Sequence, residues 1–236
     1  MVDKLNVPAC QISSKTFTIA PKSQKVVTLS RKWRPKHLWS PKTPVLYHFE
    51  AILADQGVPI DRFRRRFGFR EFEIRGKSFY LNGKPITLFR GSTLSCLGSD
   101  LARNQSEVRG KLGKSYNCVR LHLGCNNEKY IDHADEIGML IIPEASWTWR
   151  RAFPVEKRDL WLPNVLEYFE GWIRHYRNHP SIIIWNLCNE TYWGKYKKGE
   201  LEVGDQILDV VKREDPTRPQ SGDAEVTWDG RLPIIN

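Results

Sequence analysis

The sequence predicts an α/β fold in which an all-β segment precedes a parallel sheet covered by helices. Residues 1–75 contain short runs of alternating apolar and polar residues, the pattern of half-buried strands. From residue 76 onward, continuously apolar strands alternate with amphipathic helical stretches, which indicates a parallel sheet buried on both faces. Of the 236 residues, 40% are hydrophobic and 27% charged, proportions that are typical of a packed globular chain.

The all-β segment, residues 1–75, is the first predicted domain and is expected to be part of an immunoglobulin-like β-sandwich. Turn-forming stretches at residues 40–44 and 55–57 separate its alternating runs. An immunoglobulin-type sandwich has about seven strands in about 100 residues. The runs here predict about four strands, and thus an incomplete sandwich, at residues 16–19, 25–29, 46–53 and 62–69.

The second predicted domain, residues 76–236, alternates strands and helices. Its predicted helices end at recognisable stop signals, namely Gly138, Pro180 and Pro216. The pattern predicts strands at residues 86–89, 118–121, 139–142, 182–185 and from about 218, and helices at about 103–115, 127–137, 165–176 and 207–211.

Both a doubly wound sheet and a (β/α)8 barrel fit this alternation. No glycine-rich GxGxxG or GxxxxGK loop follows a predicted strand, which weakens a nucleotide-binding interpretation. A complete (β/α)8 barrel takes about 250 residues, whereas the four and a half βα units here take about 150. If the fold is a barrel, we therefore expect it to be cut near its middle.

The charge balance bears on possible partners. Lys and Arg number 37 against 27 Asp and Glu, which gives a formal charge of +10. The densest basic run, residues 62–67, lies in a strand-like stretch and is typical of a solvated strand face, so we expect no nucleic-acid partner. No apolar stretch is long enough for a membrane span, and the first residues do not resemble a signal peptide, which favours the cytoplasm.

The five cysteines give no pattern of a disulfide framework or a structural zinc site, because their number is odd and no CxxC pair occurs. Cys118 and Cys188 lie in apolar runs and are expected to be small core residues. We expect neither a metal nor a cofactor.

Polar side chains gather where the predicted strands end. Arg120 and His122 end the second strand, Glu144 the third, and Asn189 and Glu190 follow the fourth. In a barrel these strand ends meet on one face, where active sites are built. Glycoside hydrolysis needs a carboxylic acid that protonates the leaving oxygen and a second carboxylate across the sugar. Aromatic neighbours raise the pKa of such an acid, and Glu190 has three at Trp185, Tyr192 and Trp193.

The sequence resembles glycoside hydrolase family 2, the β-galactosidase, β-glucuronidase and β-mannosidase family. Residues 179–190, HPSIIIWNLCNE, resemble its acid/base signature. Further similar segments follow in the family's order and cover most of residues 38–220: LWSPKTPVLY at 38–47, FGFR at 67–70, LNGKPI at 81–86, NCVR at 117–120 and ADEIG at 134–138. The resemblance implies the first half of a (β/α)8 TIM barrel preceded by the C-terminal part of the immunoglobulin-like sandwich.

The resemblance also implies residue roles. Glu190 matches the general acid/base, and Asn189 its substrate-contacting neighbour. Arg120 matches an arginine that lines the sugar site, and Glu144 an acidic residue that organises it, although both fit equally well as a structural ion pair across the barrel mouth. His122 and Trp147 are further candidates for substrate binding. The implied partner is a carbohydrate, a β-glycoside.

Three departures from the family's pattern weaken the transfer of a galactosidase specificity or of its metal site. Arg90-Gly91 leads into Ser92 where the family often has Asn, and His122 lies two residues beyond Arg120 where many members have it three beyond. Asn186 stands where a small Gly or Ser is usual.

The family's nucleophile is a glutamate on the seventh barrel strand, whereas only 46 residues follow Glu190 here. We therefore expect the nucleophile beyond Asn236, an inactive chain in isolation, and self-association through unpaired strand edges. Asp223 and Glu225 are the alternative carboxylates within the chain. The rival hypotheses are a non-catalytic carbohydrate-binding or interaction module and a basic nucleic-acid binder.

Overall fold

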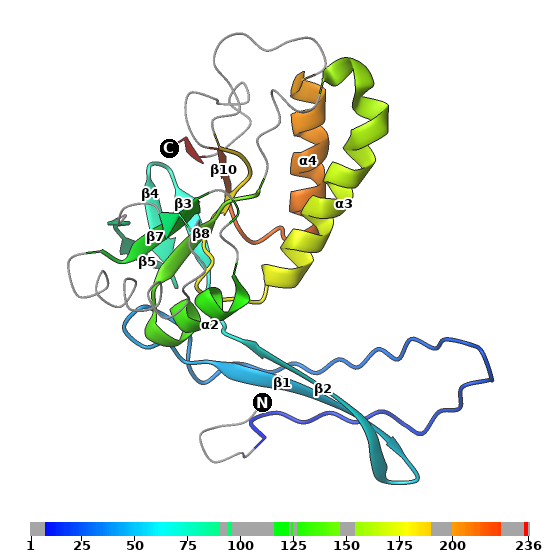
Figure 1. Ribbon diagram of the computed structural model, residues 1–236. Helices are drawn as coiled ribbons and strands as arrows, with labels where there is room; N and C mark the ends of the chain where they lie inside the picture. Colours follow the sequence, from blue (N-terminus) through cyan, green and yellow to red (C-terminus); the bar gives the residue numbers. More distant parts are fainter. Residues whose placement is uncertain are drawn as a thin grey trace.

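The structure is a computed structural model and describes residues 8–89, 94–95, 116–122, 124, 127–146, 154–189, 200–222 and 234–235. A long antiparallel ribbon of two strands extends away from the parallel strands, and one end of it lies next to the helix at Glu128–Ile137 (Figure 1). The strands are β1 (Tyr47–Asp55), β2 (Val58–Phe67), β3 (Phe72–Arg75), β4 (Ser78–Leu81), β5 (Lys84–Ile86), β6 (Leu94–Ser95), β7 (Cys118–His122), β8 (Leu140–Pro143), β9 (Trp185–Asn186), β10 (Gln220–Gly222) and β11 (Ile234–Ile235). The helices are α2 (Glu128–Ile137), the 3-10 helix η1 (Val155–Lys157), α3 (Arg158–Tyr176) and α4 (Glu200–Glu214).

The N-terminal segment contains half of the strands expected there. The runs at residues 46–53 and 62–69 correspond to β1 and β2, which pair with each other. The strands expected at residues 16–19 and 25–29 are wrong, because residues 11–39 contain no strand. Most of their apolar side chains are exposed, as at Val26, which is 91% accessible. Alternation gives a segment the capacity to form a strand, but a strand forms only where a neighbouring backbone accepts its hydrogen bonds.

A small antiparallel sheet, β3-β4-β5, joins the ribbon to the parallel strands. The strand expected at residues 86–89 is wrong in extent, because only Ile86 of these residues belongs to a strand, β5, which pairs with β4. Residues 87–89 instead run beside the start of β7, where the Asn117 amide donates to the carbonyl of Thr87 (2.8 Å) and accepts from the amide of Phe89 (2.9 Å).

The parallel strands follow one another in sequence order. β6-β7-β8 form one sheet and β9-β10-β11 another. Parallel bridges between Ile141 and Ile182 and between Glu144 and Asn186 connect β8 to the β9 segment. Doubly wound sheets reverse their strand order near the middle. The sequential order among the described strands is therefore that of a barrel.

The parallel strands are buried on both faces, as their apolar sequences predict. In β8, Ile141 belongs to the core cluster under the helices, whereas Leu140 and Ile142 belong to a second cluster that includes Trp39. Alternate side chains of a strand point to opposite faces, so β8 separates the two clusters. Cys118 and Cys188 are both fully buried, as expected of small core residues.

Helices α2, α3 and α4 confirm the predicted helical stretches, and α3 packs on α4 (Figure 1). The stretch expected at residues 103–115 lies outside the described residues. The side chain of Asn127 caps the start of α2 by accepting from the Lys129 amide, and Gly138 ends the helix in the left-handed region, with φ at +79°. None of the described helices is long and apolar enough to cross a membrane.

Gly138 provides a stability prediction. A Cβ at this position would lie 2.3 Å from the carbonyl oxygen of Pro41, in a backbone conformation that L side chains rarely adopt. Gly138→Ala should lower the free energy of unfolding by at least about 1–2 kcal/mol, the usual cost of the left-handed conformation. Gly171→Ala is the matched control, because its Cβ would meet no atom within 4 Å. It lies in α3 and should raise stability by about 1 kcal/mol. Urea denaturation measures the free energy of unfolding of both variants, and an equal change in the two would contradict this prediction.

Candidate active site

Four of the six candidate site residues lie in the described structure and meet at the carboxyl ends of three neighbouring parallel strands. Arg120 and His122 belong to β7, Glu144 directly follows β8, and Asn189 follows β9. The backbone holds these ends in register, because the amide of Ala145 donates to the carbonyl of Asn186 at 2.9 Å. Glu190 and Trp147 lie outside the described residues, as do Tyr192, Trp193, Asp223 and Glu225.

A buried ion pair forms the centre of this cluster. Arg120 donates from Nε to Oε2 of Glu144 at 2.7 Å, and its Nη2 contacts the same oxygen. Glu144 is fully buried and Arg120 is 5% exposed. Both charges are therefore withdrawn from water, and each contributes to the compensation of the other.

The ion pair also holds the residue that precedes Glu190. The Nη2 atom of Arg120 donates to Oδ1 of Asn189 at 2.6 Å, and Asn189 is itself buried. His122 lies at the edge of the cluster, with Nδ1 at 3.4 Å from Oε1 of Glu144. The chain immediately before Glu190 is thus fixed by a side chain from β7.

Two polar side chains extend the cluster under the ion pair. Asn186 donates from Nδ2 to Oε2 of Glu144 at 2.5 Å, and Ser221 donates from Oγ to Oδ1 of Asn186 at 3.0 Å. The sequence marked Asn186 only as a departure from the family's pattern, and it missed Ser221. The available signal was the place of Ser221 in the fifth predicted strand, which was expected to begin at about residue 218.

A second buried ion pair supports the strand that leads to Asn189. The indole Nε1 of Trp185 donates to Oδ2 of Asp215 at 2.9 Å, and Arg218 donates to the same oxygen at 2.5 Å. Burial pulls the pKa of Asp215 upward, but the charge of Arg218 and hydrogen bonds from Thr217, Trp185 and Arg218 outweigh it, so the pKa lies below its ordinary value. The side chain of Trp185 is thereby fixed in β9.

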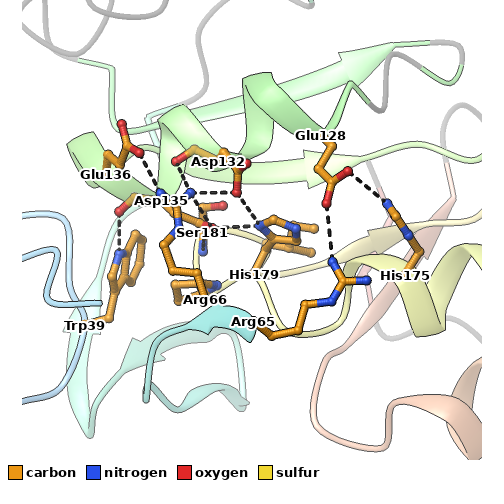
Figure 2. A network of polar contacts seen from close by, with 12 residues as sticks. Trp39, Arg65, Arg66, Glu128, Asp132, Asp135, Glu136, His175, His179 and Ser181 are labelled. Carbon is orange, nitrogen blue, oxygen red and sulfur yellow. Dashed lines mark hydrogen bonds and ion pairs between the residues drawn. The ribbon is translucent and has the colours of Figure 1, made fainter. Parts of the chain in front are cut away.

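A separate network of charges joins β2 to α2 and to the turn before β9 (Figure 2). In it, Asp132, Asp135 and His179 place one potential metal ligand each within 4.8 Å of one another. Nδ1 of His179 lies 2.7 Å from Oδ2 of Asp135, and Nη2 of Arg66 lies 2.6 Å from Oδ1 of Asp132. Because the Arg66 guanidinium already supplies positive charge to these carboxylates, the cluster is an ion-pair network between the ribbon and the helical layer.

The same network accounts for much of the basic run on β2. Arg66 also contacts Glu136 at 2.6 Å, and Arg65 lies 3.5 Å from Glu128 (Figure 2). Within the ribbon itself, Arg62 pairs with Glu50 at 3.4 Å. These arginines therefore face carboxylates of the same chain.

Two family models match the chain. Residues 72–230 match the model described as glycosyl hydrolases family 2, TIM barrel domain, and residues 3–70 match the model described as glycosyl hydrolases family 2. A β-galactosidase of Lactobacillus delbrueckii subsp. bulgaricus is 30% identical over 204 residues, which are 79% of this chain and 20% of that protein.

Solved structures of β-glucuronidases have a similar fold. The apo structure of Bacteroides uniformis β-glucuronidase 3 has a TM-score of 0.69 at 27% identity, covering 84% of this chain and 26% of that one. The β-D-glucuronidase structure of Dictyoglomus thermophilum has a TM-score of 0.72 at 26% identity, covering 84% and 37%. The chain thus spans a fifth to about a third of the length of these relatives.

Proposed function

Because this chain belongs to glycosyl hydrolase family 2, we propose that it takes part in the hydrolysis of β-glycosidic bonds with retention, with Glu190 as general acid/base. The observation that carries the proposal is the buried cluster of Arg120, Glu144 and Asn189 at the carboxyl ends of the strands, directly before Glu190. A fixed Asn189 supports a defined position for the acid that follows it.

The proposal gives each described residue a task. Arg120 and Glu144 hold Asn189 in place, and Asn189 contacts a hydroxyl of the sugar, where such hydrogen bonds strengthen in the transition state. His122 is about a quarter exposed, with 27% of its side chain accessible, and it offers a further polar contact. Trp147 is proposed as an aromatic surface for a sugar ring.

Retention needs a second carboxylate about 5–5.5 Å from the acid, which attacks the anomeric carbon and is later released by water. We propose that a glutamate beyond Asn236 supplies it. Residues 76–236 then correspond to the first half of the catalytic (β/α)8 barrel, and residues 1–75 to the C-terminal part of the sandwich domain. A homo-oligomer is compatible with this assignment of the two domains. The proposal involves no nucleic-acid or membrane partner.

The stereochemistry of hydrolysis tests the proposal. Full-length protein is mixed with p-nitrophenyl β-galactoside and β-glucuronide, and the anomeric proton of the released sugar is followed by NMR before mutarotation. The β-anomer should appear first. Initial release of the α-anomer would contradict the retaining mechanism. Binding of these glycosides without turnover would favour the non-catalytic carbohydrate-binding module.

A further inference from the structure

We propose that a cavity lined by three arginines binds a tetrahedral oxyanion, such as phosphate or sulfate. The cavity has a volume of about 220 Å³ and is bounded by the chain after β2, the turn after α3 and the segment before β10. Arg70, Arg177 and Arg218 line it, together with Asn178 and Thr217. No part of the glycosidase proposal depends on this cavity.

The cavity lies at the opposite end of the strands from the candidate active site. Arg218 donates from Nε to the carbonyl of Ile182 (2.8 Å) and from Nη2 to that of His179 (2.9 Å). Arg70 donates from Nε to the carbonyl of Pro180 (3.0 Å). Both guanidinium groups therefore contact the turn that precedes β9, whereas Asn189 follows β9.

Positive charge exceeds negative charge around the cavity. Arg218 is paired with Asp215. Arg177 lies 3.4 Å from a carboxylate oxygen of Glu214, and Glu214 also forms ion pairs with Arg174 and Arg213. Arg70, in contrast, has no carboxylate within ion-pair distance among the residues that the structure describes; Asp215 and Asp135 act on it only from farther away, and its hydrogen bonds go to backbone carbonyls. Burial, and next the charge of Arg218, hold the pKa of Arg70 well below its ordinary value. A bound anion would favour the charged guanidinium.

The donors suit an oxyanion. A guanidinium group presents five N–H donors in a planar fork that matches the oxygens of phosphate and sulfate. The bonds of Arg70 use Nε and Nη2, and those of Arg177 use Nη1, which leaves further N–H groups on each without a partner in the described part of the chain. The volume is several times the roughly 30 Å³ that one water molecule takes in the liquid, so the cavity has room for an oxyanion.

Thermal unfolding and calorimetric titration test the proposal directly. Inorganic phosphate should bind saturably and raise the melting temperature by about 3–6 °C at about ten times its dissociation constant. Sodium chloride at equal ionic strength should neither bind saturably nor raise the melting temperature by this amount. Titration with glucose 6-phosphate distinguishes free phosphate from a phosphate group carried by a larger molecule. Binding of both compounds indicates a site for phosphate groups in general, whereas binding of inorganic phosphate alone indicates a site for the free ion. Stabilisation by phosphate that is no greater than by chloride would overturn the proposal.

Variants locate the site. Arg177→Gln should weaken phosphate binding about tenfold or more, the usual effect of losing one charge-assisted hydrogen bond. Arg70→Gln should do the same where circular dichroism shows a folded protein. The matched control is Arg213→Gln, since Arg213 also pairs with Glu214 but does not line the cavity. An equal loss of affinity in Arg177→Gln and Arg213→Gln would contradict the assignment.

Discussion

Replacing Glu144 by Gln should lower the free energy of unfolding by about 3–5 kcal/mol, because it removes one member of a buried, hydrogen-bonded ion pair with Arg120. Glu144 is fully buried and accepts from both Arg120 and Asn186. An amide retains the shape of the carboxylate but neither its charge nor both of its acceptor oxygens. The loss is therefore electrostatic, and urea denaturation measures it.

A matched exposed pair provides the control. Glu202 lies 2.7 Å from Arg158, and the two side chains are 62% and 39% solvent-accessible, respectively. Glu202→Gln should cost less than about 1 kcal/mol, since exposed ion pairs contribute little. In a double-mutant cycle, Arg120→Met combined with Glu144→Gln should cost about 1–3 kcal/mol less than the sum of the single changes. Additive losses would contradict the coupling of the two charges.

Helices and buried strands were predictable because their signals are local. The apolar face of α2 and its boundaries at Asn127 and Gly138 lie within about a dozen residues, and capping needs no distant partner. The apolar run of β8 specifies burial on both faces. Such features depend on the identity of neighbouring residues and not on the rest of the fold.

Strand pairing was less predictable because it depends on distant segments. Residues 16–19 and 25–29 alternate like β1 but form no strand, and residues 87–89 are held by Asn117 instead of by a strand partner. An apolar alternation does not specify which backbone will lie beside it. The errors therefore fall where a strand's partner is remote in sequence.

In the candidate site, too, local features were predictable from the sequence and contacts between distant segments were not. The positions of Arg120, Glu144 and Asn189 at strand ends followed from the sequence, because parallel strands place their carboxyl ends together. The sequence did not predict that one guanidinium contacts both Glu144 and Asn189, or that Ser221 supports Asn186. These contacts depend on the relative rotation and spacing of β7, β8, β9 and β10.

Glu190→Gln should have the largest effect on activity. Loss of a general acid should slow hydrolysis of substrates with poor leaving groups by about 10²-fold or more, because the amide cannot protonate the departing oxygen. The alkaline limb of the pH profile of kcat/KM, which reports the acid in the free enzyme, should disappear. Glu167→Gln, a change at an exposed position of α3, is the control and should leave the activity unchanged.

The most direct test of the central claim is the leaving-group dependence of this variant. Pre-steady-state rates of glycosylation are measured for full-length wild type and Glu190→Gln across a series of aryl β-glycosides of rising leaving-group acidity. The rate ratio between wild type and variant should shrink as the leaving group improves, since a good leaving group needs no proton. An equal loss of rate across the whole series would contradict the assignment of Glu190 as the general acid.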